Sequence, residues 1–249
     1  NCAIPMTILN TIVAKQLKEF KIEVDTLIDK KNLKKDEAVF NVLREYIKTS
    51  RRIRFDGDGY SAEWEKEAKK RKLSNNKTTP EALRILTSKE SLSLLKSMNV
   101  MSEVEVKARQ EIELDAYIMH VQIEGRVLNE LVYNFIIPSA IGYQNKLIKN
   151  VMGLKEIYGA GHKKLAVSHL SIIQQISEHV EIIKEKTDAM TDARRAANKL
   201  MDSHKKATTY TEKVKSHFDE IRYHCDKLEQ LADDKDWPLT KYRELLFTK

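Results

Sequence analysis

Between Gly161 and Asp236 the chain contains neither glycine nor proline. These two residues interrupt helices more often than any others, so a long stretch without them favours helix. About 70 residues of unbroken helix would extend on the order of 100 Å. We therefore expect at least one break, near the segment "ATTYT" at residues 207–211, and we do not expect a compact globule.

Apolar positions recur through this stretch in alternating steps of four and three, which places them on one face of a helix. They are Leu165, His169, Ile172, Ile176, Val180, Ile183, Thr187, Met190, Arg194, Ala197, Met201 and His204. The same spacing occurs earlier, at Leu114, Ile118, Val121, Gly125, Leu128, Val132 and Phe135. Across the turn "GAG" at 159–161, the two stretches are expected to form an antiparallel hairpin.

Local signals predict where these helices begin and bend. Ser102 and Glu105 have the spacing of a capping box, which predicts a helix start. Pro138 lies inside the apolar pattern and predicts a kink or a break. Gly125, on the apolar seam, would let the backbone of a partner helix approach closely.

The first hundred residues are predicted to form shorter helices. A first apolar stripe has steps of three and four, and Pro5 suits the first turn of its helix. The stripe consists of Met6, Leu9, Val13, Leu17, Phe20, Val24, Leu27 and Ile28. A second helix follows, with Asp36 and Glu37 at its positive end. Its stripe is Val39, Val42, Leu43 and Tyr46.

Two further helix starts are predicted from capping residues. Ser61 can cap a helix over "AEWEKEAKKR", and Thr79 is expected to be an N-cap with Pro80 in the first helical position. The fold class is therefore all-α: an elongated helical domain built on a long antiparallel helical hairpin, with shorter N-terminal helices. No apolar run approaches the roughly 20 residues that a membrane span requires, so no membrane association is expected.

Positive charge is concentrated near the N-terminus. The net charge is +7, and residues 1–75 hold 17 Lys and Arg against 12 Asp and Glu. The runs "RRIR" at 51–54 and "KKRK" at 69–72 could bind phosphates or an anionic surface. Because no aromatic residues are interleaved to stack on bases, solvated helix faces are the preferred explanation of these runs.

No motif for catalysis or metal binding is present. Glu-x-x-His, HExxH and the glycine patterns of nucleotide-binding loops are all absent. Cys2 and Cys225 lie far apart without a CxxC spacing, which favours a reducing compartment. His169 and His204 sit on the apolar seam and are interpreted as core or edge residues. We therefore assign no catalytic, cofactor-binding or metal-binding residue.

The C-terminal stretch "IRYHCDKLEQLADDKDWPLTKYRELLF", residues 221–247, combines histidine, cysteine and several carboxylates. Cys225 continues a helical stripe and is expected to be a small buried apolar residue. Pro238 can start a last helix. A docking patch for the chain end is expected from Trp237, Tyr242, Leu245, Leu246 and Phe247. This stretch is predicted to anchor the chain and not to catalyse.

Several segments together resemble, in order, the C-terminal region of type III glutamine synthetase over essentially all 249 residues. They are "NCAIPMTILNTIVAKQL", "SAEWEKEAKKRKLSNNKTTPEAL", "EVEVKARQEIELDAYIMHVQIEGRVLNEL", "NFIIPSAIGYQN", "ARRAANKLMD" and "IRYHCDKLEQLADDKDWPLTKYRELLF". The resemblance implies a parent enzyme that ligates ammonia to glutamate with ATP and Mg²⁺ or Mn²⁺. It also implies a cytoplasmic homo-oligomer, a dodecamer of two stacked hexameric rings.

In this family, the catalytic and metal-binding motifs lie before the stretch matched by residues 1–20, so none is carried over to this chain. Together with the helix pattern, the resemblance predicts four segments. Residues 1–30 would be the terminal helix of the missing catalytic domain, and 31–101 short connecting helices and loops. Residues 102–232 would be the hairpin, and 233–249 a C-terminal docking segment.

An initial Asn instead of Met agrees with a piece of a longer protein, whose expected partners are its own catalytic domain and neighbouring subunits. Without that domain, the first helix would have its apolar stripe exposed or paired elsewhere. The chain alone is expected to be inactive and to serve packing and assembly. The alternative is a free-standing helical coiled-coil adaptor whose basic N-terminal third binds nucleic acid or another anion, although nucleic acid is not the expected partner.

Overall fold

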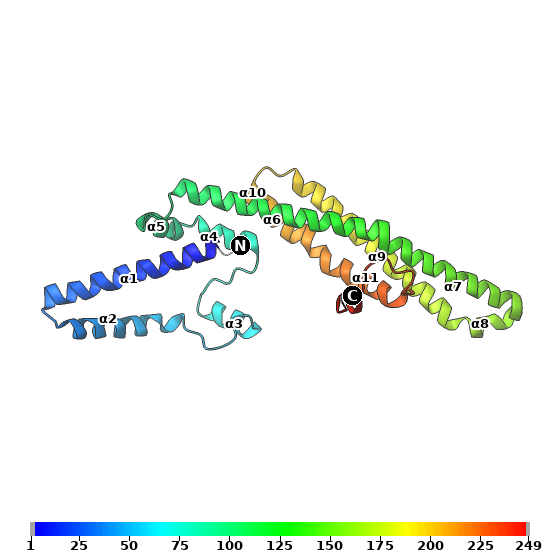
Figure 1. Ribbon diagram of the computed structural model, residues 1–249, viewed down its shortest axis with the longest axis horizontal. Coiled ribbons are helices and arrows are strands. Elements are labelled where there is room, and N and C mark those ends of the chain that lie inside the picture. Colours follow the sequence, from blue (N-terminus) through cyan, green and yellow to red (C-terminus); the bar gives the residue numbers. More distant parts are fainter. Residues whose placement is uncertain (1–2, 248–249) are drawn as a thin grey trace. The chain divides into compact units, whose positions relative to one another are not determined.

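The computed structural model describes residues 3–247, and these residues are mostly helical with no strand, as the sequence predicted (Figure 1). The chain divides into two compact units, Asn1–Glu113 and Leu114–Lys249, which are described separately. Within residues 3–247, no helix combines the length and the apolar character needed to cross a membrane.

The first unit contains a helical hairpin and three shorter helices. The hairpin consists of α1 (Ala3–Lys31) and α2 (Lys35–Thr49), and a turn with Asn32 at a φ of 50° joins them. Then come α3 (Ala62–Lys70), α4 (Thr79–Leu86), α5 (Lys89–Ser97) and the start of α6 (Glu103–Leu131). Val24, Ala38 and Val42 form the centre of the hairpin. Leu43, predicted to share this face, is exposed, because Ala38, Val42 and Tyr46 at steps of four define it instead.

Two of the predicted helix starts are confirmed and one is wrong by a residue. The Ser61 side chain accepts a hydrogen bond from the Trp64 N–H, and Ser102 and Glu105 exchange the bonds of a capping box. In α4 the cap is Thr78, not Thr79, and Pro80 is the second helical residue. Thr78 and Glu81 form a reciprocal capping box, in which the N–H of each residue donates to the side chain of the other.

The second unit is built from long helical segments that run back and forth. The rest of α6 continues through a π-helical turn (Val132–Ile136) into α7 (Ile137–Tyr158). The predicted turn at 159–161 is present, with Gly159 at a φ of 54°, and leads through α8 (His162–Leu165) to α9 (Val167–Asn198). α9 packs along α7, so the predicted hairpin forms.

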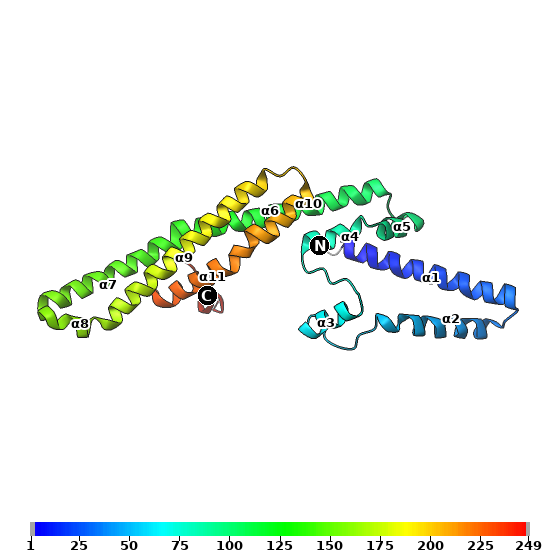
Figure 2. The same cartoon turned by 180° about the vertical axis from the view of Figure 1, so that it is seen from behind.

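The main break after α9 lies elsewhere than predicted. The chain reverses at residues 199–202, and not at 207–211, so that a further helical segment returns along α9 (Figures 1 and 2). That segment comprises α10 (Ser203–Thr209), a π-helical turn (Tyr210–Val214), a short 3₁₀ turn (Lys215–His217) and α11 (Phe218–Leu231). The Asp202 side chain caps α10 by accepting from the Lys205 N–H at 2.6 Å. Met201, assigned to the buried seam, is 95% exposed in this turn.

Pro138 neither breaks nor ends its helix, contrary to that part of the prediction. The π-helical turn just before it adds one residue, and the Ile137 N–H donates to the Val132 carbonyl. A wider turn accommodates a proline ring that lacks an N–H and crowds the preceding turn. The extra residue also shifts the seam: Val132, Ile136 and Ala140 are buried, whereas the predicted Phe135 is exposed.

Gly125 does not serve a close approach between backbones, contrary to expectation. A Cβ built on it would lie 3.7 Å from Val214 Cγ1 and 3.8 Å from the Phe218 ring, which are ordinary contacts with side chains. We expect Gly125→Ala to raise the free energy of unfolding by about 0.5–1 kcal/mol, because alanine restricts the unfolded chain and adds buried contact. Urea denaturation followed by circular dichroism measures this change. A lower free energy of unfolding of the variant would show that the added Cβ does not fit beside Val214 and Phe218.

Candidate functional site in the basic corner between α2 and α3

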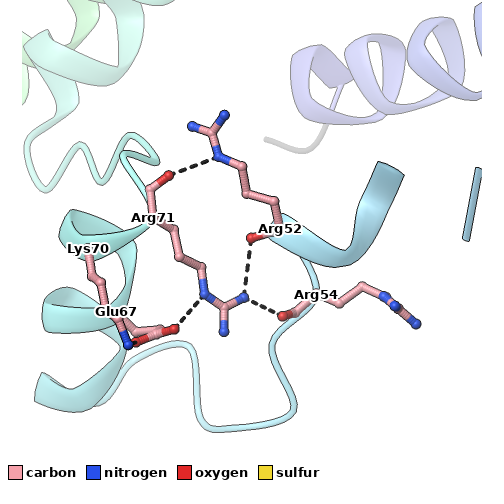
Figure 3. A network of polar contacts seen from close by, with 5 residues as sticks. All are labelled: Arg52, Arg54, Glu67, Lys70 and Arg71. Carbon is pink, nitrogen blue, oxygen red and sulfur yellow. Dashed lines mark hydrogen bonds and ion pairs between the residues drawn. The ribbon is translucent and has the colours of Figure 1, made fainter. Parts of the chain in front are cut away.

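The two basic runs, separate in the sequence, meet in the first unit where α2 ends and α3 ends (Figure 3). Arg52 Nε donates to the Arg71 carbonyl at 3.0 Å, and Arg52 Nη2 donates to the Lys72 carbonyl at 3.3 Å. Arg71 Nη1 returns a bond to the Arg52 carbonyl at 3.3 Å and also donates to the Arg54 carbonyl. An arginine of each run therefore donates hydrogen bonds to backbone carbonyls of the other run.

Arg71 is held on its other sides as well. Its Nε donates to Glu67 Oε1 at 2.6 Å, and this hydrogen bond lowers the pKa of Glu67. Its guanidinium lies over the Phe55 ring, 5.9 Å from the centroid, and that ring is 4.9 Å from the Trp64 ring. Phe55 also fills the space where a side chain at position 57 would sit, which explains Gly57. The guanidinium is thus fixed by charge, by carbonyls and by an aromatic face.

These contacts indicate what the arginines do. The carbonyl groups at the end of a helix lack intrahelical partners and carry partial negative charge. Arg52 contacts carbonyls that follow α3, and Arg54 Nη2 donates to the Ile47 carbonyl in the last turn of α2 at 3.4 Å. These hydrogen bonds occupy guanidinium donors that a bound anion would need. The corner is therefore a structural brace.

Arg71→Ala is expected to lower the free energy of unfolding of this corner by about 1–2 kcal/mol, through loss of hydrogen bonds to carbonyls and to Glu67. Arg71→Lys should recover little of this loss, because an ammonium group cannot reproduce the planar fork. Hydrogen exchange over residues 50–72 measures the effect. Lys69→Ala, an exposed cation at the same helix end, is the matched control, and equal effects of Lys69→Ala and Arg71→Ala would refute the brace.

In the second unit, His224 contacts a histidine of α9. Among the described residues it is not part of a metal-binding cluster. Nδ1 of His179 and Nδ1 of His224 are 2.9 Å apart, and the ring centroids are 5.1 Å apart, so the rings meet nearly head-on through one hydrogen bond. Burial, followed by the electrostatic effect of His224, lowers the pKa of His179. Across residues 3–247, no group of three or more His, Cys, Asp or Glu side chains could hold a metal ion.

The two histidines predicted on the apolar seam, His169 and His204, lie in two different helices. His169 is half-buried near the start of α9, and its buried Nδ1 has no hydrogen-bond partner in the described part of the chain. His204 is half-buried in α10. Sequence reasoning missed the His179–His224 pair, because His179 lies beside the seam and only the packing of α9 on α11 brings it to His224.

Cys225 is buried in α11, as predicted, and burial raises the pKa of its thiol to about 12. We expect almost no reaction with a thiol reagent at pH 8 in the native state, because the thiolate fraction is about one in ten thousand. The reaction should become fast and complete in urea. A Cys2→Ser chain leaves Cys225 as the thiol that is measured, and rapid labelling of that native chain would contradict the burial.

The C-terminal segment does anchor to the second unit, but through fewer residues than expected. Trp237 is buried at 8% exposure, and Asp236 accepts from Lys146 Nζ at 2.7 and 2.6 Å. Ser139 Oγ donates to the Asp236 carbonyl at 2.5 Å. Pro238 lies outside any helix, and the last helix α12 (Tyr242–Leu245) is a single turn. The remaining members of the expected docking patch with described side chains, Leu245, Leu246 and Phe247, are exposed, because one turn cannot cover them.

The first helix presents the N-terminal half of its apolar stripe to solvent, while the C-terminal half packs in the hairpin with α2. Only Thr11 and Val24 of α1 are buried, whereas Leu9 and Leu17 are 61% and 64% exposed. A groove of about 470 Å³ beside this face is lined by Ile4, Pro5, Ile8, Leu9, Ile12, Ala82, Leu83, Leu86 and Glu113. Large apolar faces of this kind mark surfaces that another polypeptide covers.

The comparisons with known proteins now decide the family. Residues 38–155 match the family described as glutamine synthetase C-terminal domain. A glutamine synthetase of Bacteroides fragilis (strain YCH46) is 44% identical over 250 residues, covering 100% of this chain and 34% of that protein. Residues 38–155 of this chain carry the glutamine synthetase C-terminal domain.

Further glutamine synthetase relatives agree with this assignment. A type-3 glutamine synthetase of Dictyostelium discoideum is 29% identical over 246 residues, which are 98% of this chain and 33% of that protein. A glutamine synthetase of Butyrivibrio fibrisolvens is 27% identical over 212 residues, or 85% and 30% of the two chains. The resemblance predicted from the motifs is confirmed. The chain spans about a third of the length of these glutamine synthetases.

Proposed function

We propose that this chain is the C-terminal helical part of a type III glutamine synthetase and serves subunit packing and oligomer assembly. The exposed apolar face of α1 carries the proposal, because it needs a covering surface that the described chain does not supply. In the parent enzyme, that surface would be the catalytic domain. Burying the face would stabilise the contact by roughly 25 cal/mol for each Å² of apolar area.

The chemistry is proposed to reside in the part of the parent that this chain lacks. That part would bind ATP and Mg²⁺ or Mn²⁺ and ligate ammonia to glutamate, as a step of nitrogen metabolism in the cytoplasm. The chain covers only 34% of its Bacteroides relative, which leaves ample length for such a domain. The proposed assembly is a dodecamer of two stacked hexameric rings, with the helical parts contacting neighbouring subunits. The division into four segments also stays a prediction.

Two measurements test this proposal. The isolated chain should be strongly helical and should form no γ-glutamyl product from glutamate, ammonia and ATP. In the full-length enzyme, Leu9→Asp with Leu17→Asp should reduce both ring assembly and turnover, because two charges enter an apolar contact. Asn10→Asp adds a carboxylate beside Leu9 off the stripe and is the control. Turnover by the isolated chain, or unchanged assembly of the double variant, would overturn the proposal.

The alternative of an anion-binding adaptor has no specific observation in its favour. Arg52, Arg54 and Arg71 are committed to backbone carbonyls at helix ends, which leaves fewer free cations than the sequence implied. Binding of DNA or RNA that weakens steeply with salt would revive this alternative.

A further inference from the structure

The helix α6 carries a second apolar face in the second unit, on the side away from the core. Ile118, Val121 and Gly125 face inward and are buried. Met119, Ile123 and Val127 are 51%, 51% and 47% exposed, and their steps of four place them on one outer face. A helix that is apolar on two opposite faces is normally covered on both. The outer face is therefore a candidate contact surface.

Two exposed charges flank this outer face along one edge. Asp115 precedes the apolar residues, and Arg126 lies just before the last of them, Val127. Arg126 follows Asp115 by eleven residues, or about three helical turns, so both project from nearly the same side. Neither side chain is in an ion pair within the part of the chain that the structure describes. One edge thus has a negative charge at one end and a positive charge at the other.

We propose that this outer face of α6 pairs antiparallel with the same face of a second copy of the chain. A twofold axis beside residues 120 and 121 lies equally far from Asp115 and Arg126. It therefore puts Asp115 of each copy opposite Arg126 of the other, and the two ion pairs form together. Met119 and Ile123 lie near the axis and cover each other. Because the opposite charges are symmetric to within one residue about Met119 and Ile123, a second copy fits this face better than an unrelated helix.

The size of the face sets the expected strength of the contact. About three helical turns bury much less than the roughly 1,600 Å² of a standard stable interface. The pairing of isolated chains is therefore weak and depends on concentration. In the proposed oligomer it acts together with other contacts, which raises its effective strength. The pairing extends the proposed role in assembly, but its test requires no enzyme activity.

The test measures the dimer dissociation constant of the whole chain by sedimentation equilibrium. Leu9→Asp is present throughout, so that the apolar face of α1 does not contribute. Asp115→Arg and Arg126→Asp should each raise the dissociation constant about tenfold or more, because two attractions become two repulsions. The double variant should restore the original value. Glu124→Arg makes the same charge change off the face and should leave the constant unchanged, and circular dichroism checks that every variant folds.

Two results would overturn the proposal. One is a chain that stays monomeric at its highest soluble concentration. The other is a dimer that both single charge reversals leave intact, or that the double variant fails to restore, because its contact would then lie on another surface. Either result leaves the turnover and ring-assembly tests of the full-length enzyme unaffected, so failure of this pairing is distinguishable from failure of the proposed function.

Discussion

Replacing Tyr210 by alanine is expected to lower the free energy of unfolding of the second unit by about 4 kcal/mol. Tyr210 lies in the π-helical turn after α10 and is completely buried. Its hydroxyl donates to Asn198 Oδ1 at 2.6 Å, which joins the end of α9 to the returning segment. The alanine variant would lose both the packing of the ring and the bond that closes the reversal.

Tyr210→Phe separates these two contributions. It keeps the ring and removes only the hydroxyl, so its expected cost is about 1 kcal/mol. Urea denaturation followed by circular dichroism at 222 nm gives both values. If the alanine variant were no less stable than the phenylalanine variant, the ring would not be part of the core.

Replacing Trp237 by alanine is expected to cost about 3 kcal/mol and to release the segment that follows α11. The indole is the large buried side chain of this segment, while Lys146, Ser139 and Asp236 supply polar contacts around it. Hydrogen exchange should rise over residues 232–241 and remain low in α9. Denaturation measures the accompanying loss of stability.

Asp236→Asn is the control for the Trp237 prediction. It removes an ion pair whose lysine is mostly exposed, so we expect a loss below about 1 kcal/mol. A larger loss from Asp236→Asn than from Trp237→Ala would mean that charge, and not burial, anchors this segment.

The sequence predicted the high helix content and two of the helix starts, because these depend on residues a few positions apart. The caps at Ser61 and at Ser102 with Glu105 could be predicted because each involves residues of a single helical turn. The reversal at 199–202 could not be placed by a search for glycine and proline. Its signal was Asp202, which caps α10, together with an exposed Met201. A polar N-cap such as Asp202 can start a new helix, and so divide a helical stretch, without any glycine or proline.

The sequence patterns could not predict contacts between residues that are far apart in the chain. The sequence drew attention to the basic runs but did not predict the contacts of Arg52 with Arg71 across a loop. Similarly, His224 was noticed beside Cys225, whereas its partner His179 lies 45 residues earlier. Spacing along a helix defines a face, but only packing decides which faces meet.

The π-helical turn at Val132–Ile136 fixes the phase between the two halves of one long helix. Removing a single residue there would convert the wide turn into an ordinary one and rotate everything from Ile137 onward by about 100°. Ala140 would then face water, and the whole pattern of α7 would need rewriting. In related chains, the number of residues in this region is therefore expected to vary less than the identity of its exposed side chains.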